Sequence, residues 1–287
     1  MGVCGDDPFA MYAAVCLYSV RQRVPADIAI DAYMLSPGLS EKSLKRLKRV
    51  TDLPGMCLHY DTYDPAMLEG LPCPTWSNLA THARLLLIER VGPEHSQVVY
   101  LDCDTLAVGD IMPLWDTPFD GAVLKASQDN SYPIFAKARS TEHFKAQGID
   151  PASQYFGAGV IAFNLDAWRE EKLLDRYWRV GREHGHAFTH ADQDTLNLLC
   201  YGRYRWMEPK FNVVTSCYMD WDGVLQAEPE DVRVIHYTRH NPGHHRCVHP
   251  KREMWWAALR QSGWFSAAEY ALFRLKFQAK RKIRRVR

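Results

Sequence analysis

Two aspartates, Asp102 and Asp104, stand one residue apart directly after a short apolar run, residues 98–101 with the sequence VVYL. Ligands of parallel sheets bind beyond the carboxyl ends of the strands, so a strand that ends in Asp-x-Asp would place both carboxylates there. Hard divalent cations prefer oxygen ligands and can share them with substrate phosphates. Most isolated Asp-x-Asp sequences are turns or helix caps, but the preceding apolar run favours a site for a cation and a phosphate.

A histidine-rich segment near the end of the chain supplies further ligands. His236 lies within an apolar run, RVIHY, where it is either a satisfied core residue or the group that completes the site of the two aspartates. A structural zinc site is an alternative, because nitrogen and sulfur ligands follow at His240, His244, His245, Cys247 and His249. Their spacing matches no zinc finger or ribbon.

Residues 190–197, HADQDTLN, place Asp192, Gln193 and Asp194 where a helix should begin. Acidic residues there can simply cap free amides and interact favourably with the positive end of the helix dipole. The functional alternative puts a carboxylate and an amide at the mouth of the same crevice. Residues 157–162 also fit the G-x-G-x-x-A dinucleotide pattern, but they precede the apolar run VIAFN and so predict a strand rather than a helix.

The elements that must position these groups alternate between strand-like and helical patterns. Strands are predicted at 28–35, 56–60, 98–101, 121–125, 159–164 and 233–237. Helices are predicted at 11–20, 40–50, 81–89, 166–184 and 192–199, with Ser40 as a cap. This alternation predicts an α/β fold with a mixed, mostly parallel sheet and helices on both faces.

The charge of the chain is concentrated at its end. Residues 274–287 contain eight Lys and Arg and no acidic residue, so the remainder has 27 basic and 34 acidic residues. An acidic body disfavours nucleic acid as a partner. Positions 272, 275, 279, 283 and 286 form an apolar helical stripe. We therefore divide the chain into a catalytic domain, 1–262, and a basic amphipathic tail, 263–287, that either binds an anionic membrane surface or docks its stripe on the body.

The eight cysteines include no Cys-x-x-Cys pair, and several lie in apolar runs, which is typical of reduced, mostly buried thiols in a cytosolic protein. The first residues, MGVCGDDPF, do not resemble a signal peptide, and no apolar run is long enough to span a bilayer. These features predict a cytoplasmic protein, peripheral at the inner face of the membrane.

Taken in order, six segments resemble glycosyltransferase family 8, and within it the bacterial lipooligosaccharide galactosyltransferases. They are CGDDPFA, THARL, VVYLDCDTLAVGDIMPLWDT, YFGAGVIAFNLDAWR, ADQDTLN and VIHYTR, and they span about four-fifths of the chain. The resemblance implies a nucleotide-diphospho-sugar transferase fold of the GT-A type, a retaining reaction, and Mn²⁺ or Mg²⁺ as cofactor.

The resemblance also implies roles for individual residues. The donor UDP-sugar would be bound by Asp6, Phe9, Arg84, Asp102, Cys103, Asp104 and Arg239. Within this set Asp6 would hydrogen-bond the uracil and Phe9 would stack on it. The metal would be held by Asp102, Asp104 and His236, and Asp192 and Gln193 would be catalytic.

Three positions depart from the family pattern. Gly157 stands where an asparagine is usual, and Pro8 where a polar contact to the uracil is common. The phosphate-binding lysine that usually follows His-Tyr is missing, because this chain reads TRHNPGHH. Arg239 or His240 is the substitute we consider.

The expected activity is the transfer of galactose or glucose, with retention, from a UDP-sugar to a glycan acceptor such as lipooligosaccharide or another surface glycan. A sugar-phosphate nucleotidyltransferase is a second candidate, but it would need a basic, glycine-rich loop, and residues 5–12 contain no Lys or Arg. A non-catalytic UDP-sugar or glycan-binding protein is the third.

Overall fold

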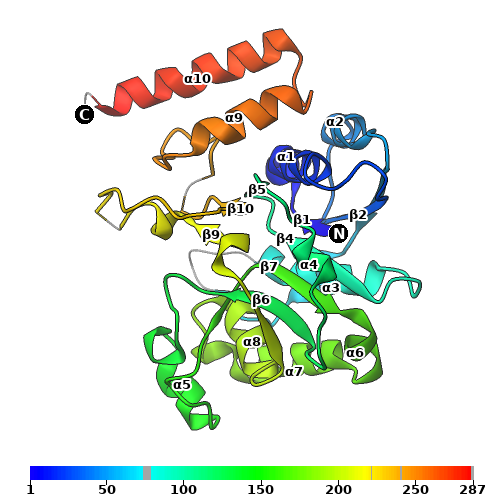
Figure 1. The fold of residues 1–287 in the computed structure, drawn as a ribbon, viewed down its shortest axis with the longest axis vertical. Helices are drawn as coiled ribbons and strands as arrows, with labels where there is room; N and C mark the ends of the chain where they lie inside the picture. The colour runs from blue at the N-terminus through cyan, green and yellow to red at the C-terminus, as the bar shows by residue number, and fades with distance from the viewer. Residues whose placement is uncertain (74–78, 221, 240, 286–287) are drawn as a thin grey trace.

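The main sheet of the molecule has seven strands in the order β3-β2-β1-β4-β7-β6-β8 (Figure 1). In this computed structural model the described residues are 1–73, 79–220, 222–239 and 241–285. The strands are β1 (Gly2–Cys4), β2 (Ile30–Ser36), β3 (Met56–Thr62), β4 (Gln97–Leu101), β6 (Leu124–Gln128), β7 (Phe156–Asn164) and β8 (Tyr204–Met207). Only β7 runs antiparallel to its neighbours, so the prediction of a mixed, mostly parallel sheet is confirmed.

A second, smaller sheet lies beside the end of β4 and consists of β5 (Thr105–Ala107), β10 (Val234–His236) and β9 (Val213–Val214). The central strand β10 runs antiparallel to β5 and parallel to β9. Its register places His236 opposite Thr105, one residue after Asp104. The small sheet therefore brings a late histidine next to the Asp-x-Asp turn between β4 and β5.

Helices cover both faces of the main sheet (Figure 1). On one face lie α1 (Ala10–Arg21), α2 (Glu41–Thr51), α9 (Arg252–Gln261) and α10 (Ala267–Arg285). On the other lie α3 (Ala83–Arg90), α6 (Leu165–Glu170), α7 (Leu173–His184) and α8 (Ala191–Leu199), while α4 (Pro113–Asp116) and α5 (Thr141–Ala146) are short peripheral helices. Side chains of β2 alternate between the two cores, with Ala32 and Met34 in one and Tyr33 and Leu35 in the other.

The predicted boundaries needed two corrections. The single helix predicted at 166–184 is two helices, because Lys172 adopts a left-handed φ of 51° that interrupts the helical hydrogen bonds. The strand predicted at 121–125 begins later, at Leu124, because Asp120 and Gly121 have positive φ values and form a turn. The G-x-G-x-x-A sequence lies within β7, as predicted.

The basic tail is a helix that packs on the body through a face other than the predicted stripe. Phe277, which is 5% exposed, packs on the ring of Trp256 in α9, as do Tyr270 and Phe273. The stripe residues Leu272 and Leu275 are instead 54% and 62% exposed. The side chains of stripe positions 283 and 286 lie outside the described part of the chain.

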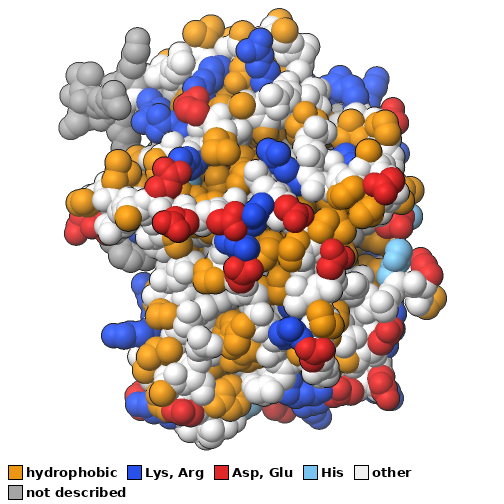
Figure 2. Space-filling model, in the orientation of Figure 1, with side chains coloured by type: hydrophobic (Ala, Val, Ile, Leu, Met, Phe, Trp, Pro, Cys, Tyr) orange, Lys and Arg blue, Asp and Glu red, His pale blue; other side chains and the backbone are white. Residues whose placement is uncertain are grey.

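The surface at this end of the molecule carries Lys and Arg side chains interspersed with hydrophobic ones (Figure 2). Within the described residues, no helix is long and apolar enough to cross a membrane. All eight cysteines are free: Cys16, Cys103, Cys200 and Cys247 are buried, Cys4 and Cys217 are half-buried, and Cys57 and Cys73 are exposed.

Candidate active site

The two aspartates and the histidine singled out in the sequence meet at the carboxyl end of β4. Asp102 and Asp104 lie on the turn between β4 and β5, where the amide of Asp102 donates to the carbonyl of Gly159. His236 Nε2 is 3.7 Å from Asp102 Oδ2 and 3.3 Å from Asp104 Oδ1. One ligand atom from each of the three residues lies within 4.8 Å of the others, which is close enough for all three to share one cation.

A buried asparagine sets the orientation of the His236 ring. His236 Nδ1 is 2.9 Å from Asn212 Oδ1, and both side chains are buried. Because an amide oxygen only accepts, Nδ1 carries a proton and Nε2 is the nitrogen that faces the two carboxylates; it donates to Asp104 when the ring is protonated and can bind a cation when the ring is neutral. Burial lowers the pKa of His236, but Asp104 and Asp102 raise it by more, so the net pKa lies above its ordinary value. The two carboxylates thus attract positive charge to this position.

Two glycines of β7 leave room for these groups. A Cβ atom on Gly159 would collide with the His236 ring and would lie 3.2 Å from Asp102 Oδ2. A Cβ atom on Gly157 would lie 3.1 Å from Asn212 Nδ2 and 3.6 Å from Asp129 Oδ2. Gly157 stands where the family pattern has an asparagine. The space that a side chain would fill at this position lies next to Asn212 and Asp129, two polar residues from elsewhere in the chain.

Arg84 connects the cluster of Asp102, Asp104 and His236 to helix α8. Its guanidinium donates from Nη2 to Asp102 Oδ1 at 2.9 Å and pairs through Nε with Asp192 Oδ2 at 2.9 Å. It also lies over the ring of Tyr100, at 4.5 Å from the centroid, and donates to the carbonyl of Ala158. Burial lowers the pKa of Arg84, but the two aspartates raise it by more. Arg84 is therefore a fixed positive charge inside the site.

The polar residues in the first turn of α8 have two different roles: one caps the helix and the others contact the candidate site. Gln193 Nε2 donates to Asp129 Oδ2 at 2.9 Å, and Gln193 Oε1 accepts from the amide of Ala158 at 2.9 Å. Asp194 Oδ2 instead accepts from the backbone amides of Thr189 and His190. The capping explanation thus holds for Asp194, whereas Asp192 and Gln193 reach the groups around β4 and β7.

Asp129 and Asn212 were missed by the sequence analysis. Asp129 directly follows β6, so the rule that found Asp102 after β4 would also have found Asp129. The predicted strand ended three residues too early, at Lys125, and hid this signal. Asn212 follows a short 3-10 helix, Pro209–Phe211, and precedes the two-residue strand β9, and no motif marks it.

The remaining donor-binding candidates line a cavity of about 400 Å³. Its lining includes Asp6, Phe9, Arg84, Asp102, Cys103 and Asp104. Asp6 Oδ1 accepts from the amide of Phe9 at 3.3 Å, which holds the turn after β1. The thiol of Cys103 donates to the carbonyl of Cys4 at 2.8 Å, and burial raises its pKa well above its ordinary value. Cys103 is thus a neutral wall residue of the cavity.

Among the described residues, two sets of candidates from the sequence do not line this cavity: Arg239, and the proposed zinc ligands that follow it. Arg239 Nη1 donates to the carbonyl of Asp220 at 2.7 Å, so binding a phosphate would require this contact to change. His240 lies outside the described residues. His249 packs between the rings of Tyr218 and Tyr237, and among the described residues 241–249 no three metal-ligating side chains come together.

The order of the sheet, its helical layers and the acidic cluster at the end of β4 define the GT-A type of nucleotide-diphospho-sugar transferase fold. The family model for glycosyl transferase family 8 matches residues 2–241, and the chain belongs to this family.

Individual relatives agree with this assignment. The crystal structure of the galactosyltransferase LgtC with donor and acceptor sugar analogues has a TM-score of 0.80, with 25% identity over 95% of this chain and 100% of that one. The lipopolysaccharide 1,2-glucosyltransferase of Escherichia coli K12 is 23% identical over 83% of this chain and 70% of its own. General stress protein A of Bacillus subtilis strain 168 is 21% identical over 91% and 93%.

Proposed function

We propose that this glycosyltransferase moves galactose or glucose, with retention, from a UDP-sugar to a glycan acceptor, either lipooligosaccharide or another surface glycan. The observation that carries the proposal is the bridge made by Arg84, which ties Asp102 of the metal cluster to Asp192 of the proposed catalytic pair. The names of two relatives, a lipopolysaccharide 1,2-glucosyltransferase and a lipopolysaccharide 1,3-galactosyltransferase, support both the hexose and the acceptor class.

Asp102, Asp104 and His236 would hold Mn²⁺, or Mg²⁺ in its place. Two carboxylates and one imidazole are a donor set that suits these cations, and Asn212, which accepts from Nδ1, leaves Nε2 of His236 free to bind the cation. When bound, the cation neutralises the charge that develops on the departing diphosphate. Arg84 adds a fixed positive charge on the inner side of the same cluster.

The start of α1 would bind the nucleobase. Phe9 is half-buried at the cavity wall, where its ring offers a face for the flat uracil. Asp6 uses one carboxylate oxygen to accept from the amide of Phe9, so its other oxygen can accept from an N–H of the base.

Gln193 and Asp192 would lie at the reacting face of the donor sugar. As the bond to the diphosphate breaks, positive charge builds on the anomeric carbon, and an amide or carboxylate oxygen stabilises it. The Gln193 amide is held by Asp129 and by the amide of Ala158, so its oxygen is fixed in place. Because an amide is not a base that can activate an acceptor from the opposite face, this arrangement favours retention. LgtC likewise has an active-site glutamine, which one solved variant replaces with glutamate.

The decisive experiment is a donor screen that measures UDP release from UDP-galactose and UDP-glucose with a glycan acceptor, with and without Mn²⁺. We expect release that requires Mn²⁺ and a product whose anomeric proton shows the α configuration by NMR. Asp104→Asn should lower the rate by roughly 10²–10³-fold with the fold intact, and the exposed control Asp27→Asn should not. A near-normal rate of Asp104→Asn at low Mn²⁺, or a β-linked product from an α-linked donor, would contradict the proposal.

The same assay separates the two alternatives. A nucleotidyltransferase would produce a nucleotide-sugar and pyrophosphate from UTP and a sugar phosphate, and would release no UDP from the screened donors. A non-catalytic binding protein would bind a UDP-sugar with Mn²⁺ in calorimetry and release nothing.

Helix α10 would hold the enzyme on an anionic membrane surface at the inner face of the membrane. Its docked face is aromatic, whereas Leu272 and Leu275 are exposed beside the exposed basic residues Lys276 and Lys280. An exposed basic amphipathic face suits a lipid surface better than it suits water. This position would place the active site near a lipid-linked acceptor.

A further inference from the structure

A second cluster of metal-ligating side chains lies at the opposite end of the sheet from the active site. Asp31 is the second residue of β2, and Cys57 and His59 lie near the start of β3, whereas Asp102 follows the end of β4. In the register of β2 and β3, Asp31 pairs with Cys57 and Tyr33 with His59, so these side chains share one face of the sheet. His95 joins them from the turn that precedes β4.

The ligand atoms of this cluster are already close together. His59 Nε2 lies 2.8 Å from Asp31 Oδ1, and His95 Nε2 lies 3.7 Å from Asp31 Oδ2. Single ligand atoms of Asp31, Cys57 and His59 all lie within 4.8 Å of one another. Ligands around a tetrahedral zinc ion are about 3.3–3.6 Å apart, given bond lengths of about 2.0–2.3 Å. Small movements of these three side chains would therefore suffice to bind an ion, and His95, which lies near Asp31 alone, would turn toward Cys57 and His59 to become the fourth ligand.

Tyr33 holds both imidazoles of the cluster in position. Its ring stacks on His59, with centroids 4.6 Å apart, and meets His95 edge-on at 6.0 Å. Tyr33 itself is buried, so the two histidines pack against a fixed surface. Supporting contacts of this kind orient metal ligands and tune their affinity.

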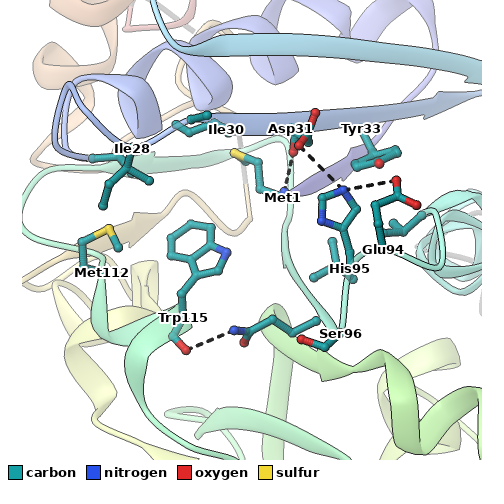
Figure 3. Close-up of a pocket in the computed structure, with 15 residues that line it drawn as sticks. Met1, Ile28, Ile30, Asp31, Tyr33, Glu94, His95, Ser96, Met112 and Trp115 are labelled. Atoms are coloured by element: carbon teal, nitrogen blue, oxygen red, sulfur yellow. Dashed lines mark hydrogen bonds and ion pairs between the residues drawn. The ribbon is translucent and has the colours of Figure 1, made fainter.

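An open route leads to the cluster. Asp31, Tyr33, Glu94 and His95 line a cavity of about 340 Å³, which opens beside the starts of β2 and β4. Figure 3 shows the His95 ring with its Nε2 facing the carboxylates of Asp31 and Glu94, at 3.7 and 3.6 Å. Cys57 and His59 are exposed, so an ion can reach them from solvent.

We propose that Asp31, Cys57, His59 and His95 form a second metal site, which binds Zn²⁺ or a similar borderline-soft transition metal. One thiolate, two imidazoles and one carboxylate match the usual zinc ligands in number and kind, whereas Mn²⁺ and Mg²⁺ prefer the oxygen-rich active-site cluster. The ion would join the edge strand β3 to β2 and to the turn before β4, and so stabilise this edge of the sheet. This inference is independent of the proposed transferase activity.

Cobalt is the probe that tests the site, because a thiolate bound to Co²⁺ gives a sulfur-to-metal charge-transfer band that a site of only oxygen and nitrogen ligands does not. We expect the full-length, metal-free protein to show this band, saturating at one equivalent of Co²⁺ and bleached by Zn²⁺. Cys57→Ser should abolish it, and His59→Ala should weaken Co²⁺ binding at least about tenfold. Zn²⁺ should also raise the melting temperature of the wild type but not that of Cys57→Ser.

Two controls make the result specific. Cys73→Ser removes the other exposed thiol, and Asp104→Asn disables the active-site cluster, and both should keep the band. Circular dichroism of Cys57→Ser verifies the fold, because Cys57 is exposed on an edge strand. The proposal is overturned if the wild type gives no thiolate band, if Cys57→Ser retains it, or if Cys73→Ser loses it.

Discussion

The chemistry of His236 depends on a neighbour that belongs to no motif. Asn212 accepts from Nδ1, which leaves Nε2 as the nitrogen that faces Asp102 and Asp104. Without this acceptor the ring could rotate or change tautomer, and a proton on Nε2 would point at the position of the cation. Asn212 is therefore a positioning residue for His236, the proposed metal ligand.

Asn212→Leu, which keeps the size of the side chain and removes the acceptor, should raise the Mn²⁺ concentration for half-maximal activity about tenfold or more. The rate at saturating Mn²⁺ should fall much less, because Asn212 acts through His236. Titration of UDP release with Mn²⁺ measures both quantities. Asn212→Asp keeps an oxygen acceptor and should restore most of the affinity. Equal loss of rate at all Mn²⁺ concentrations in both variants would argue for a general packing role instead.

At the scale of elements, β7 makes room for the site because two of its residues have no side chain. Its two glycines lie two residues apart on the same face, and neither has the positive φ that would require glycine. The requirement is steric: Gly159 faces the His236 ring, and Gly157 faces Asn212 and Asp129. The strand can therefore run directly behind Asp102 and His236.

Gly159→Ala should displace His236 and lower activity by roughly 10²-fold, as expected when one electrostatic group is lost from a site. Gly157→Ala is the matched control, because its Cβ would meet the nearest side-chain atom at 3.1 Å rather than collide. We expect it to retain more than a tenth of the activity. Rates measured at saturating Mn²⁺, with melting temperatures for both variants, make the comparison. Equal losses in the two variants would show that His236 is not what Gly159 accommodates.

Helix α10 presents different side chains on its two faces: an aromatic face docked on α9 and an exposed basic face, for which we propose lipid contact. Phe277 is buried against Trp256, and the Arg274 guanidinium lies 4.3 Å from the centroid of a Trp256 ring. Deletion of residues 274–287 would therefore expose α9 as well as remove basic residues, and it would not test membrane binding cleanly. Substitutions on the exposed face avoid this problem.

Lys276→Glu combined with Lys280→Glu should weaken sedimentation with anionic vesicles at least about tenfold, because each lysine near such a surface contributes about 1 kcal/mol. Transfer to a soluble acceptor should be unchanged. Lys137→Glu with Arg139→Glu, beside α5 at the other end of the molecule (Figure 1), removes the same charge and should bind vesicles normally. Equal binding by both double variants, or binding that is insensitive to salt, would exclude α10 as the lipid contact.

At the scale of the whole molecule, His249 couples stability to pH. Burial, followed by the charge of Lys251, lowers the pKa of His249 from 6.5 to about 4. Its Nδ1 accepts from the amide of Lys251, which requires the neutral ring. Between pH 6.5 and 4 the unfolded chain binds the proton and the folded chain does not, so stability is full above pH 6.5 and declines as the pH falls.

His249→Gln should remove this dependence. A depressed pKa of this size predicts that the wild type loses about 2 kcal/mol of unfolding free energy between pH 7 and 5 through this one residue. Urea unfolding at both pH values gives the difference, and the glutamine variant should lose that much less than the wild type. The exposed His186→Gln serves as the control and should behave as the wild type. An identical pH response in His249→Gln would refute the assignment.

The sequence determined the fold class and pointed to the residues of the candidate metal cluster, because the main signals for both are local. Strand and helix patterns follow from side-chain periodicity, and Asp-x-Asp after an apolar run predicts its own place at the end of β4. Boundaries were less predictable where a single backbone torsion decides them, as at Lys172 and Gly121. The strand error at β6 is also what concealed Asp129.

Only the tertiary structure decided which distant groups meet. Arg84 lies on α3, yet it pairs both with Asp102 and with Asp192, which stands 108 residues later in the chain. Asn212 reaches His236 through the pairing of β9 with β10, and His95 reaches Asp31 through the order of the sheet. Such contacts depend on strand order, register and helix packing, which are set by the burial of whole faces rather than by any short motif. Residue types and spacing thus determined which chemistry is available, and packing decided which side chains share it.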